Sequence, residues 1–380
     1  MENYELKIQN IQLNNINKRI LIISDIHGGY DLFVKLLEKV NYTSDDILFI
    51  LGDILEKGPD SLKTLRYVMS LYEKGNVYMV LGNNDHVCLH ILNDEKIDKY
   101  PKYLKKIRSI YHDFGEELNV DLSNDNIDNV NLRDFNKLIR ENYSKELNFI
   151  RNLPTIIESE DFLFAHASIT DYENMKNLDP YEVMRYDYFM RCNYKLPKML
   201  FVGHYPTVAF VYDKCYVGPV TDIEKNITSI DGGYTSKIGG QINMLILNEN
   251  KDRKKPLYDF YSVDDLKQVE VVKTTKGKKA SIIAIWDRER FKIIIKGKKR
   301  SLCLVKHRLC IIPNYFIYYE DNASIYNNKK TKYYCTDYTN ERLSLVKGEK
   351  VGLIKCLGKK AFIKKNNVIG FTKTKYLNIK

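Results

Sequence analysis

The chain has 380 residues and a formal net charge of +11, and it is long enough for two or three domains that each bury a core. Its first residues show no apolar signal region, and no stretch approaches the roughly 18 apolar residues of a membrane span, so we expect a cytoplasmic protein without a membrane partner. Seven cysteines without a C-x-x-C spacing argue against a disulfide scaffold and fit a reducing compartment.

The charge is divided unevenly along the chain. Residues 251–380 carry a balance of +20, whereas residues 1–250 carry a balance of −9. The two parts meet at the charged stretch ENKDRKKP, which is typical of a linker. We therefore predict a first domain over residues 1–250 and a basic, β-rich second domain over residues 251–380, with different partners.

Three short apolar runs near the start predict buried strands at residues 20–24, 47–51 and 77–81. The apolar spacing of residues 31–40 predicts an amphipathic helix after the first strand. Pro59 favours the start of a second helix that extends to about residue 74. Strand–loop–helix units in succession predict a sheet with helices packed against it.

The remainder of the first domain is predicted to contain a helical insertion followed by further strands. Residues 87–155 lack strand signals and predict helices with polar loops such as SNDNIDN, which could form a lid over a site. Further strands are expected at residues 162–165, 199–202, 227–230 and 242–247, and a helix over residues 181–191.

Short β-type runs separated by Gly, Lys and Asn turns dominate the second domain. They cover residues 281–286, 291–295, 302–305, 310–319, 351–356 and 361–364. Regular short strands without a helical period predict a small barrel or a pair of sheet modules. The lysine runs KGKK and KGKKR and aromatic stretches such as NYFIYYED favour a nucleic-acid or polyanion surface, whereas the alternative is solvated turns around an aromatic core.

Potential metal ligands follow five of the predicted strands at the point where each strand ends. They are Asp25 and His27, then Asp53, Asn83, His166 and His204. Ligands bind at the carboxyl ends of strands in open α/β sheets, and a carboxylate with an imidazole suits a divalent metal. Each residue alone is better explained as a helix cap or a satisfied histidine, but the whole set favours a metal centre.

The ordered series of Asp25-x-His27, Gly52-Asp53, Gly82-Asn83, His166 after FLFA and Gly203-His204 after MLFV resembles the calcineurin-like metallophosphoesterases. More narrowly, it is similar to the phosphoprotein-phosphatase branch, with symmetrical diadenosine tetraphosphatases and bacterial serine/threonine phosphatases. The resemblance covers about residues 20–247 and does not reach the second domain. It implies an α/β fold, a four-layer α/β/β/α sandwich with a helical insertion, followed here by a β-rich C-terminal domain.

By position, the resemblance implies a role for each ligand. Asp25 and His27 are expected to bind a first metal, Asp53 to bridge two metals, and Asn83, His166 and His204 to complete the second site. The implied reaction is hydrolysis of phosphomonoesters or nucleotide phosphoanhydrides by a hydroxide that both metals activate. The implied substrates are a phosphorylated small molecule, a dinucleotide or a phosphoprotein, and the mixed ligands favour Mn²⁺, Fe or Zn²⁺ over Mg²⁺.

Three positions depart from the pattern of this branch, which usually reads G-D-x-x-D-R-G and then G-N-H-E/D. Asn84 replaces the histidine that protonates the leaving oxygen, Glu56 replaces its aspartate partner, and Lys57 replaces the arginine that grips phosphate. General acid help is worth about 10²–10⁴-fold and matters least for an acidic leaving group such as a nucleotide. His86 is a possible substitute acid, although an exposed helix histidine is the favoured interpretation.

Two further residues were considered near the expected site. Arg185, in VMRYDYF, lies where the family has a W-x-R element and is a second candidate for phosphate binding, with a helix-surface arginine as the alternative. Asp231, in the DGG turn, is expected to be structural rather than a ligand. The alternative function from another class is a weakly active protein of this fold that works mainly as a nucleic-acid or protein binding module.

Overall fold

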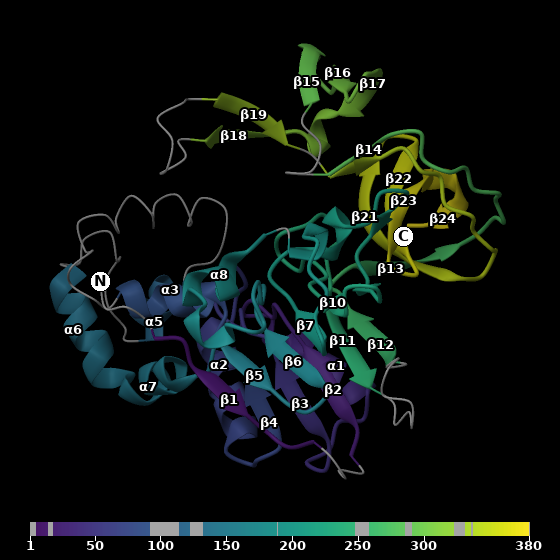
Figure 1. Ribbon diagram of the computed structural model, residues 1–380. Coiled ribbons are helices and arrows are strands. Elements are labelled where there is room, and N and C mark those ends of the chain that lie inside the picture. The colour runs from purple at the N-terminus through teal and green to yellow at the C-terminus, as the bar shows by residue number, and fades with distance from the viewer. Residues whose placement is uncertain are drawn as a thin grey trace. The chain divides into compact units, whose positions relative to one another are not determined.

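The structure is a computed structural model that describes residues 5–13, 18–91, 114–121, 132–187, 189–247, 258–285, 291–322, 331–335 and 337–379. It divides into two compact units, and the chain enters each unit more than once (Figure 1). The first unit comprises Met1–Pro206, Pro219–Ser236 and Gly240–Asp264. The second comprises Thr207–Gly218, Lys237–Gly239 and Asp265–Lys380. The expected linker lies outside the described residues.

Two mixed sheets form the first unit. In the first sheet the strand order is β12 (Tyr258–Val263), β11 (Ile242–Leu247), β2 (Ile20–Ile23), β3 (Ile47–Ile50) and β4 (Val77–Met79). In the second sheet the order is β1 (Ile8–Asn10), β5 (Ile156–Glu158), β6 (Phe162–Ala165), β7 (Met199–Val202), β10 (Ile227–Ser229) and β9 (Val220–Asp222). The strands β2, β3 and β4 run parallel, as do β6, β7 and β10.

The two sheets pack on one another through apolar side chains. The rings of Phe49 in β3 and Phe164 in β6 stack with their centroids 3.8 Å apart, within a buried cluster that also contains Ile22, Phe201 and Leu245. The strands of the first sheet are apolar on both faces because helices cover the side that does not meet the second sheet. The predicted α/β sandwich of two sheets is confirmed.

The helices α1 (Tyr30–Lys39) and α2 (Ser61–Tyr72) supply that cover, and their buried leucines share a core with Leu21 and Ile23. The described part of the predicted insertion is helical, with α3 (Asn83–Ile91), α5 (Phe114–Asp121), α6 (Leu132–Asn142) and α7 (Ser144–Asn152). Its loop SNDNIDN lies outside the described residues. The helix expected over 181–191 is shorter than predicted: α8 spans Pro180–Arg185, and a separate 3-10 turn spans Phe189–Arg191.

The second unit is rich in strands, as predicted, and its paired strands are antiparallel. One sheet has the order β24 (Leu377–Asn378), β13 (Lys267–Val271), β21 (Lys350–Leu357), β22 (Lys360–Lys365), β23 (Val368–Lys373) and β8 (Cys215–Tyr216). A second has the order β17 (Arg308–Pro313), β16 (Arg300–Val305), β15 (Phe291–Ile295), β19 (Thr331–Cys335) and β18 (Tyr318–Asn322). A short pair joins β14 (Ile283–Ala284) to β20 (Tyr338–Thr339). The run expected over 310–319 is broken after Pro313 by a 3-10 turn, Asn314–Phe316.

Candidate metal centre

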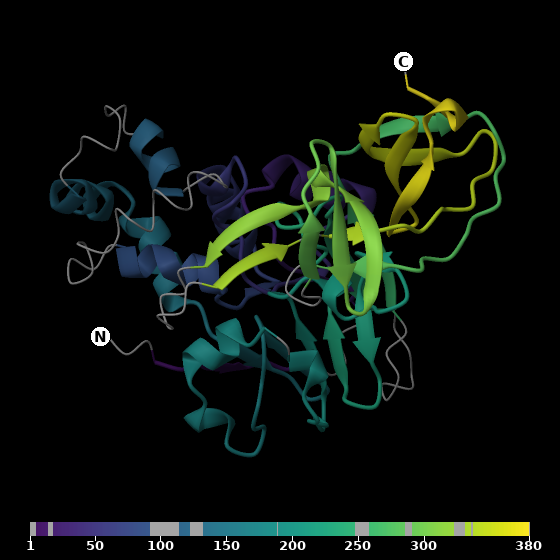
Figure 2. The same ribbon diagram turned by 90° about the horizontal axis from the view of Figure 1, so that it is seen from above.

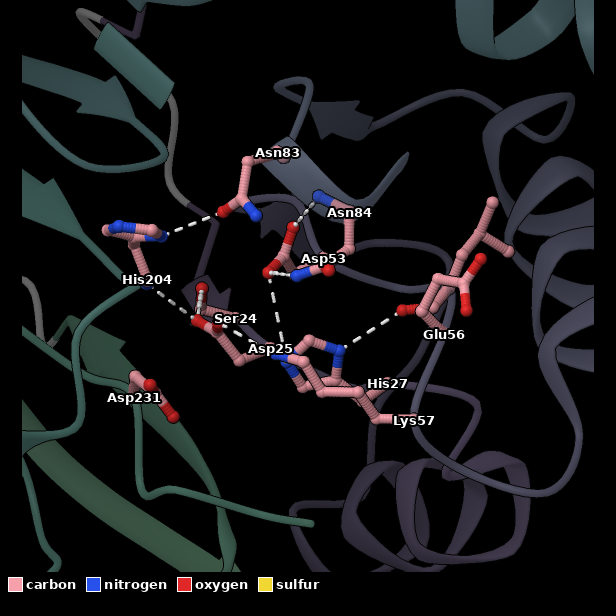
Figure 3. A network of polar contacts seen from close by, with 12 residues as sticks. Ser24, Asp25, His27, Asp53, Glu56, Lys57, Asn83, Asn84, His204 and Asp231 are labelled. Atoms are coloured by element: carbon pink, nitrogen blue, oxygen red, sulfur yellow. Dashed lines mark hydrogen bonds and ion pairs between the residues drawn. The ribbon is translucent and has the colours of Figure 1, made fainter. Parts of the chain in front are cut away.

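The six predicted ligands lie together at the ends of strands from both sheets of the first unit. Asp25 and His27 follow β2, Asp53 follows β3, Asn83 begins α3 after β4, His166 follows β6 and His204 follows β7. Figure 3 shows five of these residues, all but His166, as labelled side chains around one centre. Parallel strands that end at the same edge bring together residues far apart in the sequence, as the motif series predicted.

The backbone at these strand ends is held in the left-handed region. The φ angles of Asp25, His27, Asp53 and His204 are 53°, 46°, 55° and 65°. Each such conformation costs roughly 1 kcal/mol or more in a non-glycine residue, and such residues cluster at functional sites. Backbone hydrogen bonds hold this conformation in place. The Asp25 N–H donates to the Gly52 carbonyl at 3.1 Å, and the His27 N–H donates to the Asp53 carbonyl at 2.9 Å.

One group of potential ligands consists of Asp25, His27 and Asp53, whose donor atoms lie within 4.8 Å of one another. His27 Nε2 is 3.8 Å from Asp25 Oδ1 and 3.7 Å from Asp53 Oδ2. Asp25 Oδ2 accepts from the Ser24 hydroxyl and from the His204 N–H, but Oδ1 is buried with no hydrogen-bond partner among the described residues. A buried carboxylate oxygen that accepts no hydrogen bond is energetically costly, and a bound cation would remove that cost.

A second group shares Asp53 and adds His166 and His204. Asn83 Oδ1 lies 3.0 Å from His166 Nε2 and 2.7 Å from His204 Nδ1, and His166 Nε2 is 3.4 Å from Asp53 Oδ1. Both groups therefore use the Asp53 carboxylate, one oxygen each. A shared carboxylate between two sets of N and O donors is the arrangement that a pair of divalent cations requires.

Neighbouring acceptors orient the three imidazoles. The Leu55 carbonyl lies 3.1 Å from His27 Nδ1, and the Leu51 carbonyl lies 2.6 Å from His166 Nδ1. In His204 the pattern is reversed, because Asp187 Oδ1 lies 2.9 Å from Nε2. Each acceptor takes one ring N–H and leaves the other nitrogen facing the centre. Sequence reasoning missed Asp187, which lies two residues after the candidate Arg185.

The charges of the site favour added positive charge. Burial and the nearby carboxylate of Asp231 raise the pKa of Asp25 well above its ordinary value. Burial raises the pKa of Asp53 too, but His166, His27 and Lys57 outweigh it and hold that pKa well below the usual range. Burial also lowers the pKa of His166, yet the Asp53 carboxylate raises it to about 9. Asp25 and His166 thus hold a proton more readily than the free groups do, whereas Asp53 stays ionised.

Burial and the Lys57 ammonium have the opposite effect on His27, whose pKa they lower to about 3. Lys57 Nζ lies 3.0 Å from His27 Nε2, the nitrogen that faces the centre. The imidazole of His27 is therefore neutral, which is the form that binds metals. Lys57 places a positive charge beside the expected cation positions.

Asp85 anchors the loops that carry the ligands, a role that the sequence did not reveal. Its Oδ2 accepts from the backbone N–H groups of Asp53 at 2.8 Å and Gly82 at 3.2 Å. Its Oδ1 accepts from Ile54 at 3.0 Å and Leu55 at 3.1 Å. Burial and the charge of Asp53 raise the pKa of Asp85 to about 7, although the backbone hydrogen bonds act to lower it. The only sequence signal was its place in Gly82-Asn83-Asn84-Asp85, where the family has an acidic residue.

Asn84 contacts the shared carboxylate directly. Its backbone N–H donates to Asp53 Oδ1 at 2.8 Å and its side-chain amide donates to Asp53 Oδ2 (Figure 3). Glu56 is buried and lies away from Asn84, and its Oε2 accepts from the Phe114 N–H of the insertion at 3.4 Å. The two positions that form an acid pair in the resembled family therefore have separate contacts here.

Three other residues from the sequence analysis have defined surroundings. Arg185 is exposed at the end of α8, and its role in phosphate binding stays a prediction. His86 is buried with its ring against Tyr181, so the interpretation of an exposed helix histidine was wrong, because α8 covers this side of α3. Asp231 is buried and its Oδ1 accepts from the Gly233 N–H at 2.7 Å, as in the expected structural turn.

Comparison with known proteins decides the family. The sequence model of the family described as Calcineurin-like phosphoesterase matches residues 18–219. The chain belongs to the calcineurin-like phosphoesterases. Members of this family hydrolyse phosphoesters or phosphoanhydrides, and the buried Asp and His groups are typical of its binuclear metal sites. Within the described residues, no helix combines the length and the apolar character that crossing a membrane requires.

This phosphoesterase is similar over a short segment to curated relatives. It is 49% identical over 72 residues to the "Bis(5'-nucleosyl)-tetraphosphatase, symmetrical" of Cronobacter sakazakii, which is 19% of this chain and 24% of the relative. The protein of that name from Salmonella typhimurium is 49% identical over 73 residues, again 19% of this chain and 24% of the relative. The chain thus spans about a quarter of the length of the curated relatives that it matches.

Solved structures are similar at low identity. A putative diadenosine tetraphosphatase shares 17% identity and a TM-score of 0.43, covering 67% of this chain and 97% of that one. A cold-active protein-tyrosine phosphatase of a psychrophilic Shewanella shares 14% identity and a TM-score of 0.42, covering 70% of this chain and 85% of that one.

Proposed function

We propose that this phosphoesterase hydrolyses nucleotide phosphoanhydrides, with dinucleoside polyphosphates as the leading class, faster than alkyl phosphomonoesters. The observation that carries the proposal is Asn84, an amide bonded to Asp53 at the position where the resembled branch has an acid. Without a proton donor there, a leaving group must be stable as an anion, and a nucleotide phosphate is. The curated relatives, which are named symmetrical bis(5'-nucleosyl)-tetraphosphatases, support the same substrate class.

We further propose that the six residues at the strand ends hold two divalent cations, with Mn²⁺, or Fe together with Zn²⁺, as the expected ions. Two such ions supply Lewis acidity and an activated water when bound. The chain's own residues orient that site: Asn84 fixes both oxygens of Asp53, and Asp187 fixes the ring of His204. Lys57 would hold a phosphoryl oxygen as a point charge, and Arg185 would do so through its guanidinium.

The test compares three substrates with Mn²⁺: diadenosine tetraphosphate, p-nitrophenyl phosphate and glycerol phosphate. We expect the wild-type chain to favour the first two. Asn84→His combined with Glu56→Asp should raise turnover of glycerol phosphate relative to the other two substrates by about 10- to 100-fold, because only the alkoxide leaving group needs a proton donor. The Glu56→Asp change restores the residue that the resembled branch has at this position.

Asn84→Ala is the matched control, because it removes the hydrogen bond to Asp53 without adding an acid. It should lower turnover of all three substrates together. Equal effects of the histidine variant on all three substrates would contradict the argument from the leaving group. Negligible turnover of every substrate by a folded, metal-loaded wild-type chain would instead favour the alternative, a binding module with the phosphoesterase fold.

For the predicted basic domain over residues 251–380, we propose that it binds single-stranded nucleic acid or a similar polyanion. The ammonium groups of Lys273, Lys373 and Lys375 lie 5.7, 5.6 and 5.7 Å from the centroid of the Tyr376 ring. Three cations around one aromatic ring combine phosphate contact with a surface for base stacking. The side chains of Tyr318 and Tyr319, in NYFIYYED, lie outside the described residues.

Binding of a labelled single-stranded oligonucleotide to the full chain, followed by fluorescence anisotropy across salt concentrations, tests this proposal. Replacing Lys273, Lys373 and Lys375 together by glutamine should reduce the slope of log affinity against log salt by about 2, since each phosphate contact contributes about 0.7. The matched control replaces Lys276, Lys278 and Lys279, the lysines of the KGKK run. If the slope falls equally in both variants, oligonucleotide binding depends on the overall charge of the domain and not on a site at Tyr376.

A further inference from the structure

One sheet of the second unit exposes a row of aliphatic side chains. Leu309 and Ile311 of β17 are 64% and 61% exposed, and Ile295 of β15 is 62% exposed. The strand register places Ile311 opposite Leu302 and Leu302 opposite Ile295, while Leu309 lies opposite the half-buried Leu304. These five residues, which we call the aliphatic face, are therefore neighbours on one side of three adjacent strands. The ribbons of β15, β16 and β17 lie side by side in Figures 1 and 2.

The aliphatic face is not the core side of this sheet. The alternate residues Cys303, Val305, Cys310 and Ile312 point the other way into a buried cluster. Antiparallel sheets with one solvated side usually carry polar residues there. A contiguous exposed apolar surface marks an interaction site in a soluble protein. The sheet is thus apolar on both sides, and one of them is exposed.

Positive charge surrounds the aliphatic face. Residues 291–316 contain seven lysines and arginines and no aspartate or glutamate. Lys296, Lys298 and Lys299 are exposed in the turn between β15 and β16, and Lys306 and Arg308 are exposed around the turn between β16 and β17. The two turns lie at opposite ends of the strands, so cations flank the aliphatic face at both ends.

In contrast to the expectation of no membrane partner, which rested on the lack of a membrane-spanning segment, we propose that the aliphatic face and its basic turns bind the surface of an anionic phospholipid membrane. Such a surface supplies both apolar chains and negative headgroups, which matches the two features of this sheet. A second copy of the chain is disfavoured, because the same cations would meet across a symmetric interface. The anionic backbone of a nucleic acid matches the turns and the exposed Lys292, which lies opposite Leu304, but its bases stack on aromatic rings, and none of the five residues of the aliphatic face is aromatic.

A folded protein partner fits less well than a membrane. Protein interfaces are anchored mainly by Trp, Tyr and Arg, whereas leucine is under-represented among residues that dominate binding. The centre of the aliphatic face consists of Leu and Ile without a hydrogen-bonding side chain, so it offers contact area but little directional recognition. The proposal is independent of the phosphoesterase activity.

The test is flotation of the full chain with vesicles of phosphatidylcholine alone and of phosphatidylcholine with about one third phosphatidylglycerol, a strongly anionic surface. We expect binding to the anionic vesicles only. Replacing Lys296, Lys298 and Lys299 by glutamine should weaken that binding by about 100-fold, since each cation near an anionic surface contributes about five-fold. Replacing Leu309 and Ile311 by serine should remove the part of the binding that persists at high salt.

Matched variants control for charge and apolarity elsewhere in the same unit. The lysines at 276, 278 and 279 replaced by glutamine, and the exposed Val272 and Val346 replaced by serine, should retain vesicle binding. Unchanged thermal unfolding and phosphoesterase turnover show that each variant is folded, and Ile295→Ser replaces the double variant if that one unfolds. Absence of binding to anionic vesicles, equal losses in test and control variants, or loss of self-association rather than of vesicle binding would each overturn the proposal.

Discussion

Asp53→Asn is expected to abolish phosphoesterase turnover and to lower the amount of bound metal. Asp53 gives one oxygen to each group of potential ligands, so an amide in its place removes an anionic donor from both. A loss of about 1000-fold in turnover, which corresponds to about 4 kcal/mol of transition-state stabilisation, is the expected scale. Metal content is measured by mass spectrometry after dialysis against Mn²⁺, beside turnover of diadenosine tetraphosphate.

The exposed Asp45 offers a control for the same chemical change outside the site. Asp45→Asn should leave both turnover and metal content as in the wild type. Circular dichroism should show that Asp53→Asn is folded, because the asparagine keeps the shape of the side chain. An Asp53→Asn chain with wild-type turnover and metal content would show that the ligand assignment is wrong.

Asp85→Ala is expected to destabilise the first unit by about 4 kcal/mol. The Asp85 carboxylate is fully buried and accepts from four backbone N–H groups of the loops after β3 and β4. Removing it leaves buried donors without a partner, and each hydrogen bond to a charged group contributes about 1.5–3 kcal/mol, partly recovered if water enters. Urea unfolding followed by fluorescence measures the change, with the slope of the transition as a check on cooperativity.

Asp85→Asn provides the matched comparison for this second prediction. An asparagine keeps one acceptor oxygen and can serve about half of the N–H groups, so a loss of about 2 kcal/mol is expected. Three of the four donors belong to the loop that carries Asp53. Metal affinity should therefore fall from the wild type to Asp85→Asn and further to Asp85→Ala, as stability does. If Asp85→Ala unfolds at the same urea concentration as the wild type, then Asp85 does not anchor the ligand loops.

Strand patterns in the sequence predicted a sheet with helices packed against it, and the resemblance to a known family added the two-sheet sandwich and the residues that meet at its centre. Short apolar runs such as that of β6 have one stable environment, a buried strand, and the polar residue that follows each run must then lie at the strand's end. Parallel strands such as β2 and β3 place their ends at the same edge. The proximity of Asp25 and Asp53 follows from these two rules without knowledge of side-chain positions. His166 follows a strand of the other sheet, so its place at the same centre was predicted from the family resemblance.

The tertiary structure alone decided which groups hold that centre in place. Asp187 contacts His204, and Asp85 contacts the loop of Asp53, through hydrogen bonds whose partners lie 17 and 32 residues away. No periodicity encodes such contacts, because they depend on how loops cross after the strands have paired. The same holds for Glu56, which contacts the insertion, and for β8, which pairs with β23 of the second unit. Local patterns determine which segments become strands, whereas the geometry of packing determines which polar groups meet.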